Sequence, residues 1–358
     1  MTSQSSGVIG GVDTHKFTHH ASVIDPIGQL LGDREFKADM AGHRALVLWL
    51  KSFGPLRAVG VEGTGSYGAA LARVMAGEGI SVIEINRPNR LARRTNGKSD
   101  RLDSEQAARA VLAETSSALP KSKDGAVEVI RMLRTARSTA VKSHTQAFNA
   151  LHSIVVVAPE PLREELVKLR KKALINRCAG LRPGGDDLAA LDGKDLLITG
   201  SKTAMRSLAE RCIELDRQIK SLGAQILALV ERTAPALLAL PGVGAEVAAQ
   251  LLVTAGDNPE RIRNERAFAK LCGVAPQPAS SGQTSGRHRL SRGGDRAANS
   301  ALYIVAITRM RHHAPTRAYL ERRTAEGLTK REIMRCLKRY IAREVFAALP
   351  TPALQMAA

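Results

Sequence analysis

The stretch that decides the fold is VIGGVD, residues 8–13, an apolar run that ends in an acidic residue. A second run of the same kind, AVGVE, occupies residues 58–62. Short runs of this type are typical of buried strands. The surrounding patterns predict, in chain order, strands over 8–12, 21–25 and 29–36, a helix over 41–52, a strand over 57–62, a helix over 69–78 and a strand over 80–85. The N-terminal part is therefore expected to be an α/β domain built on a sheet.

Acidic residues stand where two of these strands end. Asp13 follows the first run and Glu62 closes the second, so both carboxylates reach the same sheet edge if the strands are neighbours. Asp100 and Asp103 begin a predicted helix over 100–118, and their spacing places them on one face about 5–6 Å apart. Four converging acids would repel one another without a cation. Such hard oxygen ligands suit Mg²⁺, and a two-metal pair can activate an attacking oxygen and stabilise a leaving one at phosphorus.

Each acid also has a simpler interpretation on its own. Asp13 can cap a turn, and Asp100 and Asp103 can stabilise a helix N-terminus through the helix dipole. The combination of strand-end acids with a paired helical acid is, however, the layout of an RNase H-like nuclease sheet. We therefore predict an RNase H-like fold for this part of the chain.

The chain is strongly basic. Lys and Arg outnumber Asp and Glu by 53 to 34, which gives a net charge of +19 and an isoelectric point near 10.3. This balance indicates a polyanionic partner, with nucleic acid as the leading candidate. Aromatic residues make up only 3% of the chain, which favours contacts with the nucleic-acid backbone over base stacking. No run of about 18 apolar residues occurs, so membrane association is not expected. The four cysteines form no C-x-x-C pair and are expected to be ordinary buried thiols.

The middle of the chain is predicted to be mostly helical. Helical patterns cover 127–154 and 161–175, a loop rich in glycine and aspartate covers 180–193, and a weak strand pattern covers 196–199. The clearest periodicity is an apolar heptad seam formed by Leu208, Cys212, Leu215, Ile219, Leu222, Ile226 and Leu229. This seam packs either on the helix at 127–154 of the same chain or on a second copy in a coiled coil, and the sequence leaves both open.

The C-terminal part is expected to be mainly helical and to contact DNA. LPGVG at 240–244, followed by a helical pattern to Thr254, predicts a helix-hairpin-helix. Gly242 and Gly244 would permit its tight turn, and the free backbone donors of the next helix would bind phosphate. A plain turn between helices would look the same. Helices are also predicted over 299–311 and 330–349. The last carries a basic stripe, either a solvated face or a nucleic-acid contact, made of Arg331, Arg335, Lys338, Arg339 and Arg343.

Three motifs in the N-terminal part resemble those of a known family. They are GVDTHK at 11–16, VEGTGSY at 61–67 and KSDRLDSEQA at 98–107. They look like the acidic motifs of the DEDD transposases, insertion-sequence recombinases that are related to Piv-type DNA invertases and have an N-terminal domain similar to the resolvase RuvC. The resemblance assigns Asp13, Glu62, Asp100 and Asp103 to the metal-binding acids of a two-metal Mg²⁺ site, in which Mn²⁺ would substitute. A basic segment, either a phosphate-contact arm or a solvated loop, contains Arg87, Arg90, Arg93, Arg94 and Lys98.

A loop in the C-terminal part is similar to the catalytic loop of the same family. There, a serine directly before glycine, a few residues after a G-x-x-P motif, is the nucleophile. The motif corresponds to residues 273–276 and the serine to Ser281, with Ser280 as the alternative. Ala279 stands where family members often have an aromatic residue, and the later glycine turn carries arginine instead of lysine, so the register of the loop stays open. Serine needs a base or metal to take its proton, and cations must accept phosphoryl charge, a role open to Arg287, Arg289 and Arg292.

The resemblance implies a site-specific DNA recombinase that works through a covalent serine–DNA link. It implies a RuvC-like catalytic domain over 1–120, a helical coiled-coil connector over 121–232 and a C-terminal transposase domain over 233–358. Expected partners are double-stranded donor and target DNA, a structured noncoding guide RNA, and further copies of the chain, from dimer to tetramer, in the cytoplasm of a prokaryote near its nucleoid. Two hypotheses compete: a RuvC-like hydrolytic nuclease that uses the acids without the serine, and a noncatalytic nucleic-acid-binding protein.

Overall fold

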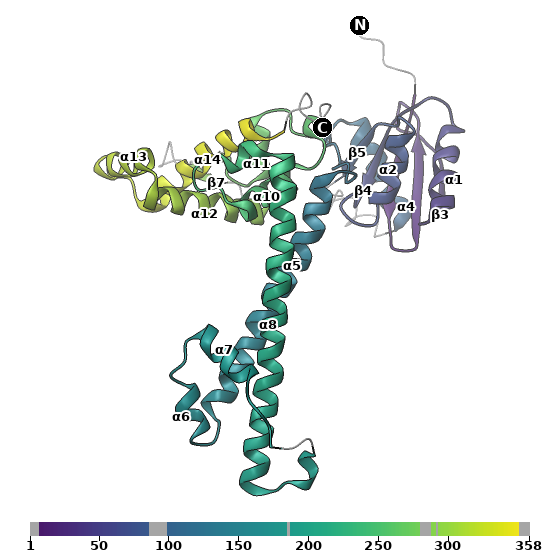
Figure 1. The fold of residues 1–358 in the computed structure, drawn as a ribbon. Coiled ribbons are helices and arrows are strands. Elements are labelled where there is room, and N and C mark those ends of the chain that lie inside the picture. Colours follow the sequence, from purple (N-terminus) through teal and green to yellow (C-terminus); the bar gives the residue numbers. More distant parts are fainter. Residues whose placement is uncertain (1–6, 86–98, 185–186, 280–287, 291–292, 351–358) are drawn as a thin grey trace.

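The computed structural model describes residues 7–85, 99–184, 187–279, 288–290 and 293–350. Figure 1 shows a sheet with its helices, a long pair of helices, and a group of shorter helices near one end of that pair. Among the described residues, no helix is both long enough and apolar enough to cross a membrane.

A mixed five-stranded sheet forms the N-terminal part. Its strands are β1 (Val8–Thr14), β2 (Thr18–Ile24), β3 (Leu30–Lys37), β4 (Leu56–Glu62) and β5 (Val82–Ile85), ordered β3-β2-β1-β4-β5. The first three strands are antiparallel, whereas β4 and β5 run parallel to β1. All five predicted strands are confirmed, and the mixed sheet with a mostly helical remainder of the chain is consistent with an RNase H-like fold.

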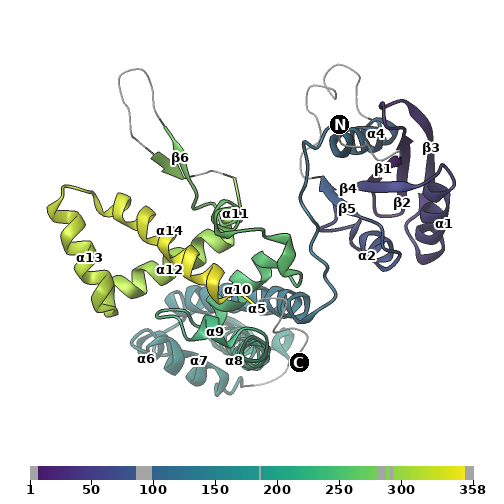
Figure 2. The same ribbon diagram turned by 90° about the horizontal axis from the view of Figure 1, so that it is seen from above.

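Helices cover both faces of this sheet (Figure 2). On one face, α1 (Met40–Lys51) and α2 (Ala69–Gly77) bury Leu46, Leu50 and Leu71 against the strands. On the other face, α4 (Asp100–Leu112) presents small residues, among them Ala107 and Ala108. Because alanine side chains are short, the axis of α4 lies closer to the strands than a leucine-rich helix could.

Two long helices form the connector. α5 (Ala126–Val156) and α8 (Gly193–Thr233) pack along each other in opposite directions, and α6 (Leu162–Leu166), α7 (Lys171–Ala179) and the short η1 (Leu188–Ala190) lie beside their distal half (Figure 1). The heptad seam faces α5 of the same chain, with Cys212 and Ile226 fully buried. Leu215, Ile219 and Leu222 at its centre are only half-buried.

The C-terminal part is helical, as predicted, with one small hairpin. Its elements are α9 (Pro235–Leu238), α10 (Ala245–Ala255), η2 (Pro259–Arg261), α11 (Glu265–Leu271), β6 (Pro276–Pro278), β7 (His288–Leu290), α12 (Arg296–His312), α13 (Ala314–Ala325) and α14 (Lys330–Ala348). Phe268, Leu302 and Ile341 lie in its core, together with Ile130 of α5 and Val230 of α8. The long helices are therefore anchored in this part of the molecule.

Several sequence predictions were wrong in detail. The strand expected over 196–199 lies inside α8, where the helix continues through it and buries Thr199. The helix expected over 161–175 is divided into α6 and α7, because the chain turns to bring Leu166 and Leu174 into one core. The helix expected over 100–118 ends at Leu112, since Ala118 instead pairs with Glu84 beside β5. No helix was expected over α13.

The cysteines have no disulfide partner. Cys178, Cys212 and Cys272 are buried, as expected, whereas Cys336 is half-buried. Burial raises the pKa of the Cys272 thiol to about 12, so this thiol is unreactive.

Candidate metal centre and serine-bearing hairpin

Strand register places Asp13 and Glu62 side by side. β1 and β4 are parallel, with Gly11 opposite Gly60 and Val12 opposite Val61, so the next residues are the two acids. Side chains alternate along a strand, which puts each acid on the same sheet face as the glycine two residues before it. That face is the one covered by α4. The two strands are thus neighbours, which is the condition under which the sequence places both carboxylates at one edge.

The two glycines let α4 rest directly on the strands. A Cβ atom on Gly11 would stand 2.0 Å from the carbonyl oxygen of Ser104, and one on Gly60 would stand 2.5 Å from that of Ala107. Ser22 of β2, opposite Gly11, contributes a hydroxyl–hydroxyl hydrogen bond of 2.6 Å to Ser104. This row of small residues fixes α4 over the centre of the sheet.

The first turn of α4 lies at the acidic end of β1. Ser99 caps the helix by accepting a hydrogen bond from the amide of Leu102. Asp100 and Asp103 both lie in the first turn, and Asp103 is almost fully buried. Arg101 pairs with Asp33 of β3 at 3.1 Å, which ties the helix start to the sheet from its outer side.

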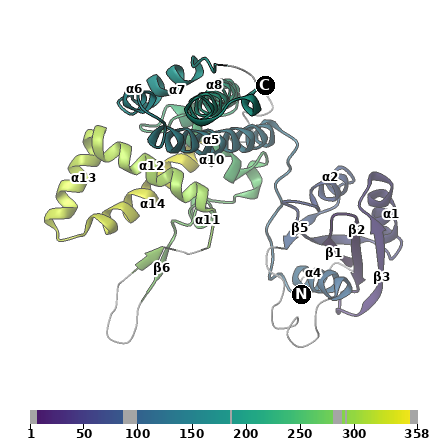
Figure 3. The same cartoon turned by 90° about the horizontal axis from the view of Figure 1, so that it is seen from below.

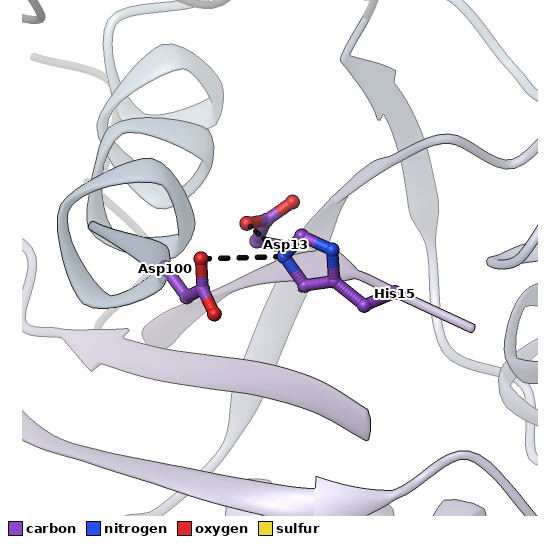
Figure 4. Close-up of side chains that lie close together, drawn as sticks. All are labelled: Asp13, His15 and Asp100. Atoms are coloured by element: carbon purple, nitrogen blue, oxygen red, sulfur yellow. Dashed lines mark hydrogen bonds and ion pairs between the residues drawn. The ribbon is translucent and has the colours of Figure 1, made fainter. Parts of the chain in front are cut away.

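Asp13, His15 and Asp100 form a close group (Figure 4). The Nε2 atom of His15 lies 3.1 Å from Asp13 Oδ2 and 3.3 Å from Asp100 Oδ1. One ligand atom from each of the three residues falls within 4.8 Å of the others. Within the described ranges, Glu62 and Asp103 are at the same edge but do not belong to this close group.

The electrostatics of the group fit a divalent cation. Burial raises the pKa of the Asp13 carboxyl above its ordinary value, the charges of Asp103 and Asp100 raise that pKa further, and His15 lowers it. Ionisation of Asp13 is therefore disfavoured in the metal-free protein. A bound cation would remove this cost, and carboxylate oxygens are the ligands that Mg²⁺ and Mn²⁺ prefer.

His15 was not singled out among the predicted ligands. Its signal in the sequence is the spacing of two residues from Asp13, which puts both side chains on one face where β1 ends. The basic segment of Arg87, Arg90, Arg93, Arg94 and Lys98 lies outside the described residues, as do Ser280, Ser281, Arg287 and Arg292.

The hairpin of β6 and β7 flanks the predicted serine loop. Its base, Cys272 and Gly273 just before β6, is held by hydrogen bonds from α12. Asn299 of α12 donates hydrogen bonds to the carbonyl oxygens of Cys272 and Gly273, at 3.2 and 2.8 Å. The buried Lys338 of α14 donates to the side-chain oxygen of Asn299 at 2.8 Å. Arg289 of β7 is exposed. The hairpin and α4 lie on the same side of the molecule, each in its own part (Figures 2 and 3).

The glycine turn before α10 is held in place by a side chain of α12. Gly242 has a positive φ of 74°, which favours glycine, and Gly244 caps α10 without a side-chain hydrogen bond. The buried Arg309 of α12 donates to the carbonyl oxygen of Pro241 and pairs with Glu344, both at 2.7 Å. Both glycines are exposed, so the turn presents its backbone to solvent.

Comparison with known proteins adds family information. Residues 10–158 match a family model described as a transposase, and residues 234–321 match one described as a transposase of the IS116/IS110/IS902 family. An uncharacterized protein of insertion element IS110 from Streptomyces coelicolor is 27% identical, over 96% of this chain and 94% of its own length. An uncharacterized protein of insertion element IS116 from Streptomyces clavuligerus is 21% identical, over 95% and 94%.

The two matches carry the two candidate sites. The first includes Asp13, Glu62, Asp100 and Asp103, and the second includes the β6–β7 hairpin. With both matches in this order, and with relatives aligned over nearly its whole length, the chain belongs to the IS110 family of transposases, enzymes that cut and recombine DNA.

Proposed function

We propose that this transposase cuts and joins DNA strands of an insertion element by combining the acid edge of its sheet with a serine of its C-terminal hairpin. The acid edge comprises Asp13, Glu62, Asp100 and Asp103. The observation that carries the proposal is the convergence of Asp13, from the end of β1, with Asp100, from the start of α4, in a chain of a transposase family.

The acid edge would hold Mg²⁺, as a two-metal site in which Mn²⁺ substitutes. Support comes from the close carboxylate oxygens of Asp13 and Asp100, and from the burial and neighbouring acidic charges that raise the pKa of Asp13. Divalent cations held there would polarise the scissile phosphate. The acids would hold the cations at the end of β1, and His15 restrains the two carboxylates that it contacts.

Ser281 would be the nucleophile. Its Oγ attacks the scissile phosphorus, a bond between serine oxygen and phosphorus forms, and the bond between phosphorus and the leaving strand oxygen breaks. The serine proton passes to a base at the site, and the leaving oxygen is protonated to a strand-end hydroxyl. Attack of a strand hydroxyl on the phosphoserine reverses the step and joins strands. Arg287, Arg289 and Arg292 would accept the negative charge at phosphorus.

Several surfaces would bind nucleic acid. Residues 233–358 contain 19 Lys and Arg against 9 Asp and Glu, more than half of the net charge of the chain. The exposed turn of Gly242 and Gly244 would bind DNA phosphate as a helix-hairpin-helix, and the basic residues of 86–98 would also contact phosphate. We further propose that a structured guide RNA pairs with donor and target DNA, and that two to four copies assemble. The half-buried centre of the heptad seam favours such assembly.

Trapping of covalent intermediates tests this function. Wild-type protein incubated with end-labelled element DNA and Mg²⁺ should give a protein–DNA adduct that survives denaturation. Ser281→Ala should abolish the adduct and Asp13→Asn should abolish both adduct and cleavage, whereas Ser280→Ala should retain both. Cleavage by the Ser281→Ala variant without any adduct would instead establish the hydrolytic nuclease, and absence of all strand cleavage would favour a noncatalytic binding protein.

A further inference from the structure

The distal part of the connector carries an unusual concentration of positive charge. Residues 167–184, which include α7, contain six Lys and Arg and no Asp or Glu. Lys168, Arg170 and Lys172 are exposed, and none forms an ion pair with any described residue. Arg177 at the other end of α7 differs, because it pairs with Glu165.

The charges at the start of α7 oppose what a helix prefers. Arg170 is the N-cap residue and provides no side-chain hydrogen bond, the first turn begins with Lys171 and Lys172, and it contains no acidic residue. A helix N-terminus carries partial positive charge, so cations there are unfavourable when no anion is present. α4 of the same chain shows the usual arrangement, with a serine cap and two acids. The arrangement at α7 is therefore unfavourable for the isolated chain and favourable once an anion binds.

Positive charge continues beyond the C-terminal end of α7. Arg182 and Lys202 border an open cavity of about 790 Å³ between the α6–α7 segment and α8. Neither forms an ion pair with a described residue, whereas Glu160 and Glu165 on the same cavity are paired with Arg163 and Arg177. The unneutralised charge at the cavity is thus positive.

We infer that Lys168, Arg170, Lys172, Arg182 and Lys202, here called the connector surface, bind the phosphodiester backbone of a nucleic acid away from the acid edge. The inference rests on membership of a DNA-recombining family and not on the serine mechanism. Several separate cations without carboxylate partners fit a repeating polyanion. A membrane is a poorer fit, since Val167 is the only exposed large hydrophobic residue described in 167–184.

The length of α8 determines how far the connector surface lies from the C-terminal part. α7 packs on α8 at Cys212, and the C-terminal part packs on it at Val230. Eighteen residues of helix span about 27 Å at 1.5 Å per residue. A duplex held by the C-terminal part and by the connector surface would therefore be contacted at two places on the order of one helical turn apart.

The salt dependence of binding tests the inference. The variant K168Q/R170Q/K172Q leaves Lys171 in place, because Lys171 packs over the ring of Phe148. Binding without metal is measured separately on a short DNA duplex and on an RNA hairpin of equal length. For whichever nucleic acid binds the connector surface, the slope of log affinity against log salt should become less steep by about 2 to 3 in the variant. Each lost phosphate contact contributes roughly 0.7–0.9 to this slope. In the variant, protection of the nucleic-acid backbone from hydroxyl radicals should disappear at one site. That site should lie about one helical turn from the sites that remain protected.

A matched control removes the same charge elsewhere. Lys37 of β3, Arg44 of α1 and Arg73 of α2 are exposed and form no ion pair with a described residue, so K37Q/R44Q/R73Q should leave both slopes nearly unchanged. The inference would be overturned if the two variants changed the salt dependence of nucleic-acid binding equally, or if neither nucleic acid showed a change. It would also be overturned if only binding to anionic lipid vesicles changed. Asp13→Asn should keep wild-type slopes while losing cleavage, so failure of the proposed catalytic site is seen independently.

Discussion

Gly11 of β1 and Ser104 of α4 touch backbone to backbone: a Cβ atom on the glycine would lie 2.0 Å from the serine carbonyl oxygen. This contact sets the height of α4 above the sheet and hence the distance between Asp13, two residues beyond the glycine, and the first turn of the helix. A purely steric contact between two main chains thus determines the geometry of a chemical site.

Replacing this glycine should separate the two halves of the acid edge. Gly11→Ala pushes α4 away from β1, and we expect the free energy of unfolding to fall by about 1–3 kcal/mol, the usual cost of overpacking. Mn²⁺ affinity, measured by titration calorimetry, should fall as well. Gly77→Ala on α2 is the matched control, because its Cβ meets nothing within 4 Å. Unchanged Mn²⁺ affinity in a folded Gly11→Ala variant would contradict the assigned role of the contact.

Divalent metal should stabilise the fold through the acid edge. A ligand that binds only the folded state at a concentration of 100 times its dissociation constant adds about 2.7 kcal/mol. We expect Mg²⁺ or Mn²⁺ to raise the melting temperature of the wild-type protein and to leave that of Asp13→Asn unchanged. Because Asp13 has a raised pKa, its ionisation costs the metal-free protein stability as pH rises through that pKa. Asp13→Asn should therefore be the more stable of the two proteins at neutral pH without metal.

The hairpin base should matter for the serine step and not for metal binding. Asn299→Ala leaves the carbonyl oxygens of Cys272 and Gly273 and the ammonium of Lys338 without this partner. The free energy of unfolding should drop by about 1–3 kcal/mol. Covalent adduct formation should slow at 25 °C, whereas Mn²⁺ affinity stays at the wild-type value. A parallel loss of both properties would instead indicate general unfolding.

A buried histidine pair should make the sheet domain sensitive to acid. His19 of β2 and His43 of α1 stack with ring centroids 5.2 Å apart. Burial, followed by the charge of His43, lowers the pKa of His19 from 6.5 to about 4. Between these values the unfolded chain takes up a proton that the folded chain excludes. The stability is therefore complete above pH 6.5 and is lost as pH falls towards 4, by on the order of 3 kcal/mol.

Urea unfolding at a series of pH values measures this effect. The double variant H19F/H43L should show a flatter pH dependence between 6.5 and 4 than the wild-type protein. His312→Phe, at an exposed position of α12, should retain the wild-type dependence. Identical profiles for all three proteins would rule out the pair as the source of acid sensitivity.

Much of the sheet could be predicted from the sequence because its strands are short, apolar and bounded by turns. The runs at 8–13 and 58–62 placed two acids at strand ends, and the observed parallel register brings these ends together. The role of Gly11 and Gly60 could not be anticipated, since it depends on which helix covers that face. His15 was overlooked because its closeness to Asp100 arises only when α4 packs on β1.

The connector illustrates the opposite case. Residues 196–199 have a strand-like local pattern, yet they lie in a helix of 41 residues, because packing along α5 outweighs a weak local preference. The seam of α8 could pack in two ways, and only the structure identifies α5 of the same chain as its partner. α13 has little apolar periodicity, and Thr316 is its single buried residue, so sequence patterning carried no signal for it.

The attachment point of DNA on the protein distinguishes attack by Ser281 from the other possibilities. Trypsin cleavage after Lys270 and Arg287 releases one peptide, residues 271–287, that contains both candidate serines. After reaction with element DNA in Mg²⁺ and nuclease trimming, mass spectrometry of this peptide should find a nucleotide on Ser281, and none when Asp13 is replaced by asparagine. A nucleotide on another residue, or efficient strand cleavage with this peptide unmodified, would exclude Ser281 as the nucleophile.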